Sequence, residues 1–321
     1  MQPRGFFMKH VVVITGPTAT GKSKAAMKLA LLLNGEIVNA DSMQVYRGMD
    51  IGTAKPSELD RRTVPHHLYD ICDPTERFSA GDYLNRAENV IRDILNRGNL
   101  PIVVGGTGLY SRALLTGFFE QPELDPTVEE CLLVSHSRAG LEYLYRMLQK
   151  VDDTFSRGIS PKDTQRIIRG LSFYFSTGRQ LSSMWDDICS PLQDLDFIVV
   201  GLDADRAKLY EAINSRVDKM VSSGFLNEVS GLMERYGCKD YHAFKAIGYR
   251  EMMLVAEGRG SLEDAVERIK RNTRRFAKRQ FTWFKGQTVQ WFRVDPLLGK
   301  IPVAEIHNFI KIKIRNVGEE A

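Results

Sequence analysis

The sequence has few cysteines and no long apolar run. Its 321 residues include four cysteines, Cys72, Cys131, Cys189 and Cys238. Because no two of them form a C-x-x-C pair, we expect neither a structural zinc site nor a disulfide framework, and a reducing cytoplasm suits the chain. No apolar stretch approaches the ~20 residues that span a bilayer. The N-terminus also lacks the apolar segment of a secretory signal. We therefore expect a cytoplasmic protein with no membrane partner.

One segment lacks acidic residues altogether. The net charge is only +4, yet seven of the twelve residues from Arg268 to Arg279 are Lys or Arg and none is Asp or Glu. Arg268, Arg271, Arg275 and Arg279 lie three or four positions apart, which puts them on one stripe of a helix. Such a stripe either binds the phosphates of a nucleic acid or is a solvated charged face.

Short apolar runs alternate with helical patterns along most of the chain. Hydrophobic residues make up 43% and charged residues 26%, which is typical of a globular protein with a real core. The runs predict strands at residues 11–14, 36–39, 101–104 and 197–201, and an alternation with aromatics predicts a late edge strand at residues 287–294. Helices are predicted at residues 22–33 and 80–97 and over most of residues 205–279. Strands alternating with helices indicate an α/β fold with a mainly parallel sheet flanked by helices.

The alternation is interrupted in the middle of the chain. Residues 118–178 contain no convincing strand, whereas residues 142–151 and 161–175 have helical patterns. We therefore predict an inserted all-helical domain at residues 118–178. The α/β core would consist of residues 1–117 and 179–321.

A phosphate-binding motif follows the first predicted strand and opens the first helix. It matches G-x-x-x-x-G-K-[ST] with Gly16, Pro17, Thr18, Ala19, Thr20, Gly21, Lys22 and Ser23. Backbone N–H groups of such a loop surround phosphate oxygens, Lys22 supplies a charge for the outer phosphate, and Ser23 offers a hydroxyl to Mg²⁺. The core is therefore expected to resemble that of P-loop NTPases. Kinases and other transferases also use this loop, whereas the absence of an N-K-x-D motif disfavours a GTPase.

Other polar groups follow the predicted strands. In an open α/β sheet, ligands bind at the carboxyl ends of the strands, so Asp41 and Thr107 are expected near the phosphate loop. Position alone leaves three roles open for Asp41: a general base, an outer ligand of Mg²⁺ or a helix cap. The adjacent pair His66 and His67 cannot easily chelate one metal ion, so we favour a structural or substrate-orienting role for it.

Several further stretches combine with the phosphate loop into a specific pattern. They are residues 41–46 (DSMQVY), 48–56 (GMDIGTAKP), 65–67 (PHH), 105–110 (GGTGLY), 246–250 (AIGYR) and 278–283 (KRQFTW). Together these stretches resemble the tRNA dimethylallyltransferase family, also called tRNA isopentenyltransferases, over nearly the whole chain and in the family's order. Residues 41–56 and the final basic-aromatic motif are the most specific part of this resemblance.

The resemblance implies a reaction and a set of substrates. A dimethylallyl group would pass from dimethylallyl diphosphate to the exocyclic amine of the adenosine 3′ of the tRNA anticodon, releasing diphosphate. The phosphate loop would hold the prenyl diphosphate instead of ATP, and Ser23 would help bind the Mg²⁺ cofactor. Asp41 would be the general base, Arg216 would contact the diphosphate, and Thr107 would lie beside the adenosine.

The resemblance also implies how the partner RNA is bound. The inserted domain would clamp the anticodon stem-loop of tRNA, and the chain is expected to act as a monomer. The implied tRNA-contacting residues are Asp41, Ser42, Met43, Gln44, Thr107, Gln165, Arg166, Ile167, Ile168, Arg169, Arg250, Lys278, Arg279, Gln280 and Trp283.

Three other functions stay open at this point. The chain could be a prenyltransferase of free adenine nucleotides, a P-loop metabolite kinase or a non-catalytic RNA-binding protein. A small acceptor requires neither the basic helix nor the insertion, which disfavours a prenyltransferase of free nucleotides. Intact Lys22, Ser23 and Asp41 disfavour a non-catalytic RNA-binding protein. An assay of phosphoryl transfer distinguishes a metabolite kinase.

Overall fold

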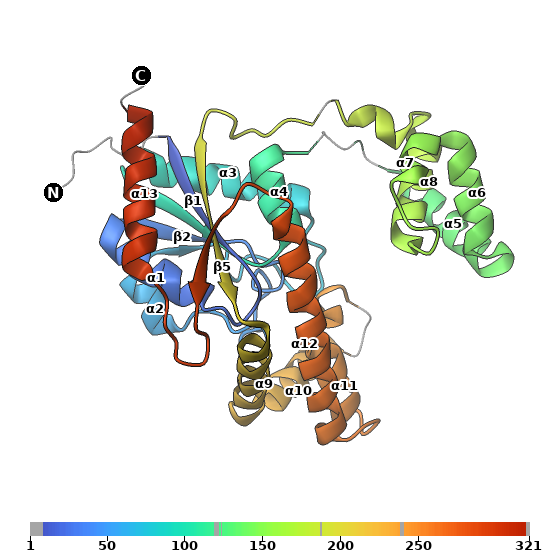
Figure 1. Ribbon diagram of the computed structural model, residues 1–321. Helices are drawn as coiled ribbons and strands as arrows, with labels where there is room; N and C mark the ends of the chain where they lie inside the picture. The colour runs from blue at the N-terminus through green and yellow to red at the C-terminus, as the bar shows by residue number, and fades with distance from the viewer. Residues whose placement is uncertain (1–8, 119–121, 123, 187, 238–240, 319–321) are drawn as a thin grey trace. The chain divides into compact units, whose positions relative to one another are not determined.

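The computed structural model describes residues 9–118, 122, 124–186, 188–237 and 241–318 (Figure 1). The chain divides into two compact units, one made of Met1–Leu115 with Pro191–Ala321 and the other of Thr116–Ser190. The predicted insertion, residues 118–178, lies within the second unit, which continues to Ser190. None of the helices in the described ranges has the length and apolar character that crossing a membrane requires.

The first unit is built on a six-stranded sheet of order β3-β2-β4-β1-β5-β6 in which every pairing is parallel. The strands are β1 (His10–Thr15), β2 (Gly35–Asn39), β3 (His66–His67), β4 (Leu100–Val104), β5 (Asp196–Ala204) and β6 (Gln290–Val294). The predicted α/β class is confirmed. The two-residue β3 was not predicted, because it is too short to show a pattern.

Helices flank this sheet and extend beyond one of its ends (Figure 1). They are α1 (Lys22–Leu33), α2 (Glu58–Thr63), α3 (Ala80–Asn96), α4 (Gly108–Thr116), α9 (Arg206–Ser222), α10 (Phe225–Tyr236), α11 (Tyr249–Ala256), α12 (Leu262–Lys285) and α13 (Val303–Gly318), with a 3₁₀ turn η2 at Ala243–Lys245. Helix α1 ends where Asn34 takes a left-handed conformation, and α3 begins with a capping box of Ser79 and Asp82.

Two hydrophobic cores hold the first unit together. One joins the central strands to α1 and α13, with Leu29, Ile102 and Ile310 fully buried. The other joins α9, α10, α11 and α12 to residues 45–49 of the loop after β2, and it includes the buried Tyr249. This second core fixes the helices of the C-terminal half at the carboxyl edge of the sheet.

The second unit is helical and has a core of its own. Its helices are α5 (Pro126–Ala139), α6 (Leu141–Val151), α7 (Asp153–Arg157) and α8 (Thr164–Thr177), with a 3₁₀ turn η1 at Leu181–Met184. Helix α8 starts later than predicted because the Asp163 side chain caps it by accepting from the N–H of Arg166. Helix α5 was not predicted, although Asp125 caps it and Pro126 stands in its first turn.

Candidate active site at the carboxyl edge of the sheet

Three loops meet where neighbouring strands end. Strand β4 pairs with β1 on one side and β2 on the other, so Val104 lies opposite both Ile14 and Asn39. The phosphate loop (residues 16–23) follows β1, Asp41 follows β2, and residues 105–107 follow β4. The predicted meeting of these residues at one edge of the sheet is therefore observed.

Local geometry fixes the phosphate loop. Gly16 has φ 132°, and a Cβ there would lie 2.4 Å from the carbonyl oxygen of Leu202. The Lys22 Nζ donates to the carbonyl oxygens of Gly16 at 3.0 Å and Pro17 at 2.8 Å. Strand β1 precedes the loop and α1 follows it, which is the context that the motif requires.

The loop forms one wall of a cavity of about 330 Å³. Residues 18–23 line it together with Asp41, Arg216, Phe276 and Gln280. A second cavity of about 360 Å³ is lined by Ser42, Met43, Thr107 and Arg279 among others. Thr18, Asp41, Arg216 and Phe276 belong to both linings, so the two cavities share a wall.

Asp41 is held by hydrogen bonds at the shared wall. Its backbone N–H donates to Asn39 Oδ1 at 2.9 Å, and its own Oδ1 accepts from the N–H of Met43 at 2.9 Å. No helix begins in residues 41–47 of this described stretch, so Asp41 is not a helix cap. The Thr107 hydroxyl accepts from the N–H of Ser42 at 2.9 Å, which joins the loops after β2 and β4.

Two cationic side chains, Lys22 and Arg216, line the phosphate loop cavity. Burial, together with the nearby charge of Arg216, lowers the pKa of Lys22 from its ordinary value of 10.5 to about 7, while Asp41 opposes the shift. Burial also lowers the pKa of Arg216, which stays far above neutrality as a guanidinium does. Two crowded cations favour an anionic ligand, because it would relieve their repulsion.

The donor set of the cavity suits Mg²⁺ held mainly by a ligand. The described residues contain no group of three His, Cys, Asp or Glu side chains that could hold a metal ion. Ser23 is exposed at the start of α1 and lines the same cavity as Asp41. Magnesium commonly binds to one or two protein oxygens, phosphate oxygens and water, so these residues fit it.

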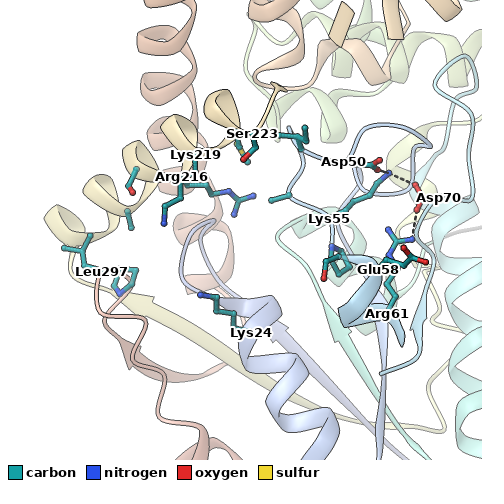
Figure 2. A pocket seen from close by; sticks show the side chains of 18 residues that line it. Lys24, Asp50, Lys55, Glu58, Arg61, Asp70, Arg216, Lys219, Ser223 and Leu297 are labelled. Atoms are coloured by element: carbon teal, nitrogen blue, oxygen red, sulfur yellow. Dashed lines mark hydrogen bonds and ion pairs between the residues drawn. The ribbon is translucent and has the colours of Figure 1, made fainter. Parts of the chain in front are cut away.

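An open groove of about 860 Å³ adjoins the phosphate loop cavity (Figure 2). Both linings include Lys24 and Arg216. Lys219 adds a third cation on the α9 side, where Figure 2 shows it beside Arg216. These charges make the groove electrostatically attractive to an anion that approaches the phosphate loop.

The basic segment, residues 268–279, forms the middle of α12, and its two sides differ. Arg274 donates to Asn214 Oδ1 at 2.6 Å and Lys270 pairs with Asp218 at 2.8 Å, so both bind to α9. The predicted stripe is exposed along its whole length. It consists of Arg268, Arg271, Arg275 and Arg279. Lys278 is exposed as well, and Trp283 retains 38% exposure against Gly108.

Some of the residues implied in tRNA contact have side chains engaged elsewhere. Gln280 is 5% exposed; its Oε1 accepts from the N–H of Thr18 at 2.8 Å and its Nε2 donates to the Gly106 carbonyl at 2.8 Å. Gln44 donates to the Thr53 carbonyl at 2.9 Å.

In the helical unit, Ile167 and Ile168 are 0% and 7% exposed and belong to its core. Their side chains are therefore not at the surface, unlike those of Gln165 and Arg166. Arg169 is half-buried, and Glu129 lies near it. In the first unit, Arg250 is exposed near the start of α11.

Sequence reasoning missed part of the cavity lining. Phe276 belongs to none of the predicted site motifs, yet it borders both cavities. Tyr69 also lines the first cavity, where burial and the charge of Asp41 raise its pKa. The turn after β6 returns to the phosphate loop through Asp295 and Ile301. Because these lining residues lie far from residues 16–23 in the sequence, no local sequence pattern indicates that they share a cavity.

The fold and the site define an α/β protein of the phosphate-loop class with a carboxylate facing the loop. The IPP transferase family model matches residues 44–287, and the isopentenyl transferase model matches residues 9–65. The chain belongs to the IPP transferase family.

Relatives and solved structures agree with this assignment. The chain is 45% identical to the tRNA dimethylallyltransferase of Geobacter sulfurreducens, covering 88% of this chain and 91% of that one. It is 42% identical to the enzyme of that name from Bacillus subtilis, with 89% and 91% covered. The structure of a tRNA isopentenylpyrophosphate transferase from Bacillus halodurans is similar, with a TM-score of 0.71, 40% identity and 97% and 98% coverage. A eukaryotic dimethylallyltransferase acting on tRNA has a TM-score of 0.76 at 30% identity, with 89% and 74% covered.

Proposed function

We propose that this chain is a tRNA dimethylallyltransferase. It transfers the dimethylallyl group of dimethylallyl diphosphate to the exocyclic amine of the adenosine 3′ of the anticodon and releases diphosphate. The observation that carries this proposal is the position of Asp41, which lines both the phosphate loop cavity and the cavity beside Thr107. A diphosphate in the first cavity and an adenine in the second would meet at this carboxylate.

The chemistry follows from the two ends of the site. The C1–O bond of the prenyl diphosphate breaks as the adenine amine forms its bond to C1, and the amine proton passes to a carboxylate oxygen of Asp41. An aromatic amine is a weak nucleophile, so a base within hydrogen-bond reach contributes about 10²–10⁴ in rate. Lys22, Arg216 and the N–H groups of the phosphate loop stabilise the charge that grows on the departing diphosphate. Bound Mg²⁺ would share that charge through Ser23 and the phosphate oxygens.

The surroundings of the site support tRNA as the acceptor. Arg279 of the exposed stripe also lines the cavity beside Thr107, so phosphate contacts and base recognition are continuous. We also propose that the chain acts as a monomer in the cytoplasm.

Incubation with labelled dimethylallyl diphosphate, Mg²⁺ and unmodified tRNA tests the proposal directly. Nucleoside analysis is expected to find the label on the adenosine 3′ of the anticodon. Label on free adenine nucleotides but not on tRNA would contradict the proposed acceptor. Phosphoryl transfer from ATP without prenyl transfer would favour a kinase instead.

A further inference from the structure

A half-buried carboxylate outside the cavities holds the loop of residues 50–53. The Glu228 carboxylate on α10 accepts from the N–H groups of Asp50 at 2.9 Å, Ile51 at 2.6 Å and Gly52 at 3.2 Å. It also accepts from the Tyr249 hydroxyl at 2.7 Å. Hydrogen bonds to a carboxylate are stronger than neutral ones, so the three from the loop hold it on α10, and the fourth joins Glu228 to α11.

Packing restricts the same loop. A Cβ on Gly52 would lie 2.3 Å from Phe225 and 2.6 Å from Tyr249, so only glycine permits this close approach. Phe225 and Tyr249 pack edge to face with centroids 5.1 Å apart. The loop therefore has little freedom as long as Glu228 and the two rings stay in place.

The next residue of the loop connects it to the active site. The Thr53 carbonyl accepts from Arg216 Nη2 at 3.4 Å and from Gln44 Nε2 at 2.9 Å. Figure 2 shows Arg216 extending from α9 toward the loop that carries Asp50 and Lys55. Arg216 lines the phosphate loop cavity, and Gln44 follows Asp41 by three residues.

We propose that Glu228 is a positioning residue, which holds residues 50–53 so that the Thr53 carbonyl keeps the guanidinium of Arg216 directed at the diphosphate. This inference rests on the proposed function of the phosphate loop cavity. Glu228 itself touches no reacting atom. Its effect passes through two hydrogen-bonded steps, from its carboxylate to the loop and from the loop to Arg216.

Calorimetry with inorganic pyrophosphate and Mg²⁺ measures this effect without the transfer reaction. We expect Glu228→Ala to weaken pyrophosphate binding about tenfold, because Arg216 loses its fixed orientation. Glu234→Ala, which removes an exposed carboxylate from the same helix, is the matched control and is expected to bind as the wild-type chain does. In steady-state assays the KM for dimethylallyl diphosphate should rise in Glu228→Ala and stay unchanged in Glu234→Ala.

A double-mutant cycle separates positioning from a general loss of structure. In an Arg216→Ala background, pyrophosphate binding is measured at concentrations up to millimolar. There Glu228→Ala is expected to weaken binding less than about twofold. An equal loss in both backgrounds would overturn the inference. If Glu228→Ala does not fold, Glu228→Gln and Tyr249→Phe replace it in the cycle. Each is expected to weaken pyrophosphate binding about threefold, and only where Arg216 is present.

The outcomes also separate this inference from the proposed function. A wild-type chain that does not bind pyrophosphate would overturn both. A wild-type chain that binds pyrophosphate, with unchanged binding in the folded Glu228 variants, would overturn only the role of Glu228.

Discussion

Asp41 and Lys22 line one cavity, and the proposed reaction gives each of them a chemically distinct task there. Asp41 has a hydrogen bond from the N–H of Met43 to one of its two carboxylate oxygens. The carboxylate can therefore be held in place and still accept a proton. Lys22 is buried beside Arg216, so its charge depends on what binds.

Replacing Asp41 tests its role as the base. Asp41→Asn keeps an oxygen for the Met43 N–H but cannot take the amine proton, and Asp41→Ala removes both. We expect each change to lower kcat about 10²–10⁴-fold and to leave tRNA affinity nearly unchanged. Single-turnover prenyl transfer and filter binding measure the two quantities. Near-normal turnover of either purified variant would contradict a base at this position.

Lys22 makes diphosphate binding depend on pH. Its pKa of about 7 means that the side chain loses its proton above neutrality in the ligand-free chain. The diphosphate binds the ammonium form, so affinity should fall as pH rises above about 7 and binding should take up a proton. Calorimetry in buffers of different ionisation enthalpy measures that uptake. Because Lys22→Arg stays charged, its diphosphate affinity should no longer fall above about pH 7. If the fall persists in this variant, it comes from ionisation of the ligand and not from Lys22.

The same group affects stability with a definite sign. The folded-state pKa of Lys22, about 7, lies below its ordinary value of 10.5. Between these two pH values the unfolded chain binds more protons than the folded one. The contribution of Lys22 to the free energy of unfolding therefore rises with pH across this window and is smallest below pH 7.

At the scale of one element, α12 combines two functions in a single basic segment. Lys270 and Arg274 bind α9 and thereby hold the helix against the site. Arg268, Arg271, Arg275 and Arg279 are exposed along the other side. Arg279 stacks over Phe276 with its guanidinium 5.7 Å from the ring centroid, next to the shared cavity wall.

The exposed stripe should dominate the salt dependence of tRNA binding. Arg275→Ala and Arg279→Ala are each expected to weaken tRNA binding and to reduce the slope of log K against log[salt] by about one. Lys313→Ala on α13, also an exposed cation, is the control and should leave the slope unchanged. Filter binding over a range of salt concentrations gives these slopes. A tRNA affinity that hardly varies with salt would contradict phosphate contacts by this helix.

At the scale of the molecule, the two units have separate cores and should lose structure separately. Leu148 is fully buried in the helical unit and Leu29 in the α/β unit. Leu148→Ala is expected to destabilise its unit by about 2–5 kcal/mol. Hydrogen exchange should then accelerate in α6 and α8 but not in β1 and β4. Leu29→Ala is the matched control and should show the reverse pattern, whereas equal acceleration in both units would contradict independent cores.

The sequence by itself determined the features that depend on near neighbours. The apolar runs predicted β1, β2, β4 and β5, because a strand buried on both faces is mostly apolar. The phosphate loop was readable because its glycines, Lys22 and the adjoining strand and helix lie within a few residues of one another. The resemblance to a family supplied roles for Asp41 and Arg216 that spacing alone left open.

Only the tertiary structure decided which polar side chains serve the site and which support it. Gln280 connects Thr18 to Gly106, and Glu228 holds residues 50–52, across separations that no periodicity reveals. In the sequence, the cations of the basic segment look alike. Only their contacts with α9 distinguish Lys270 and Arg274 from the exposed stripe. The physical reason is that a buried polar group needs a partner, and the fold, not the adjacent sequence, supplies that partner.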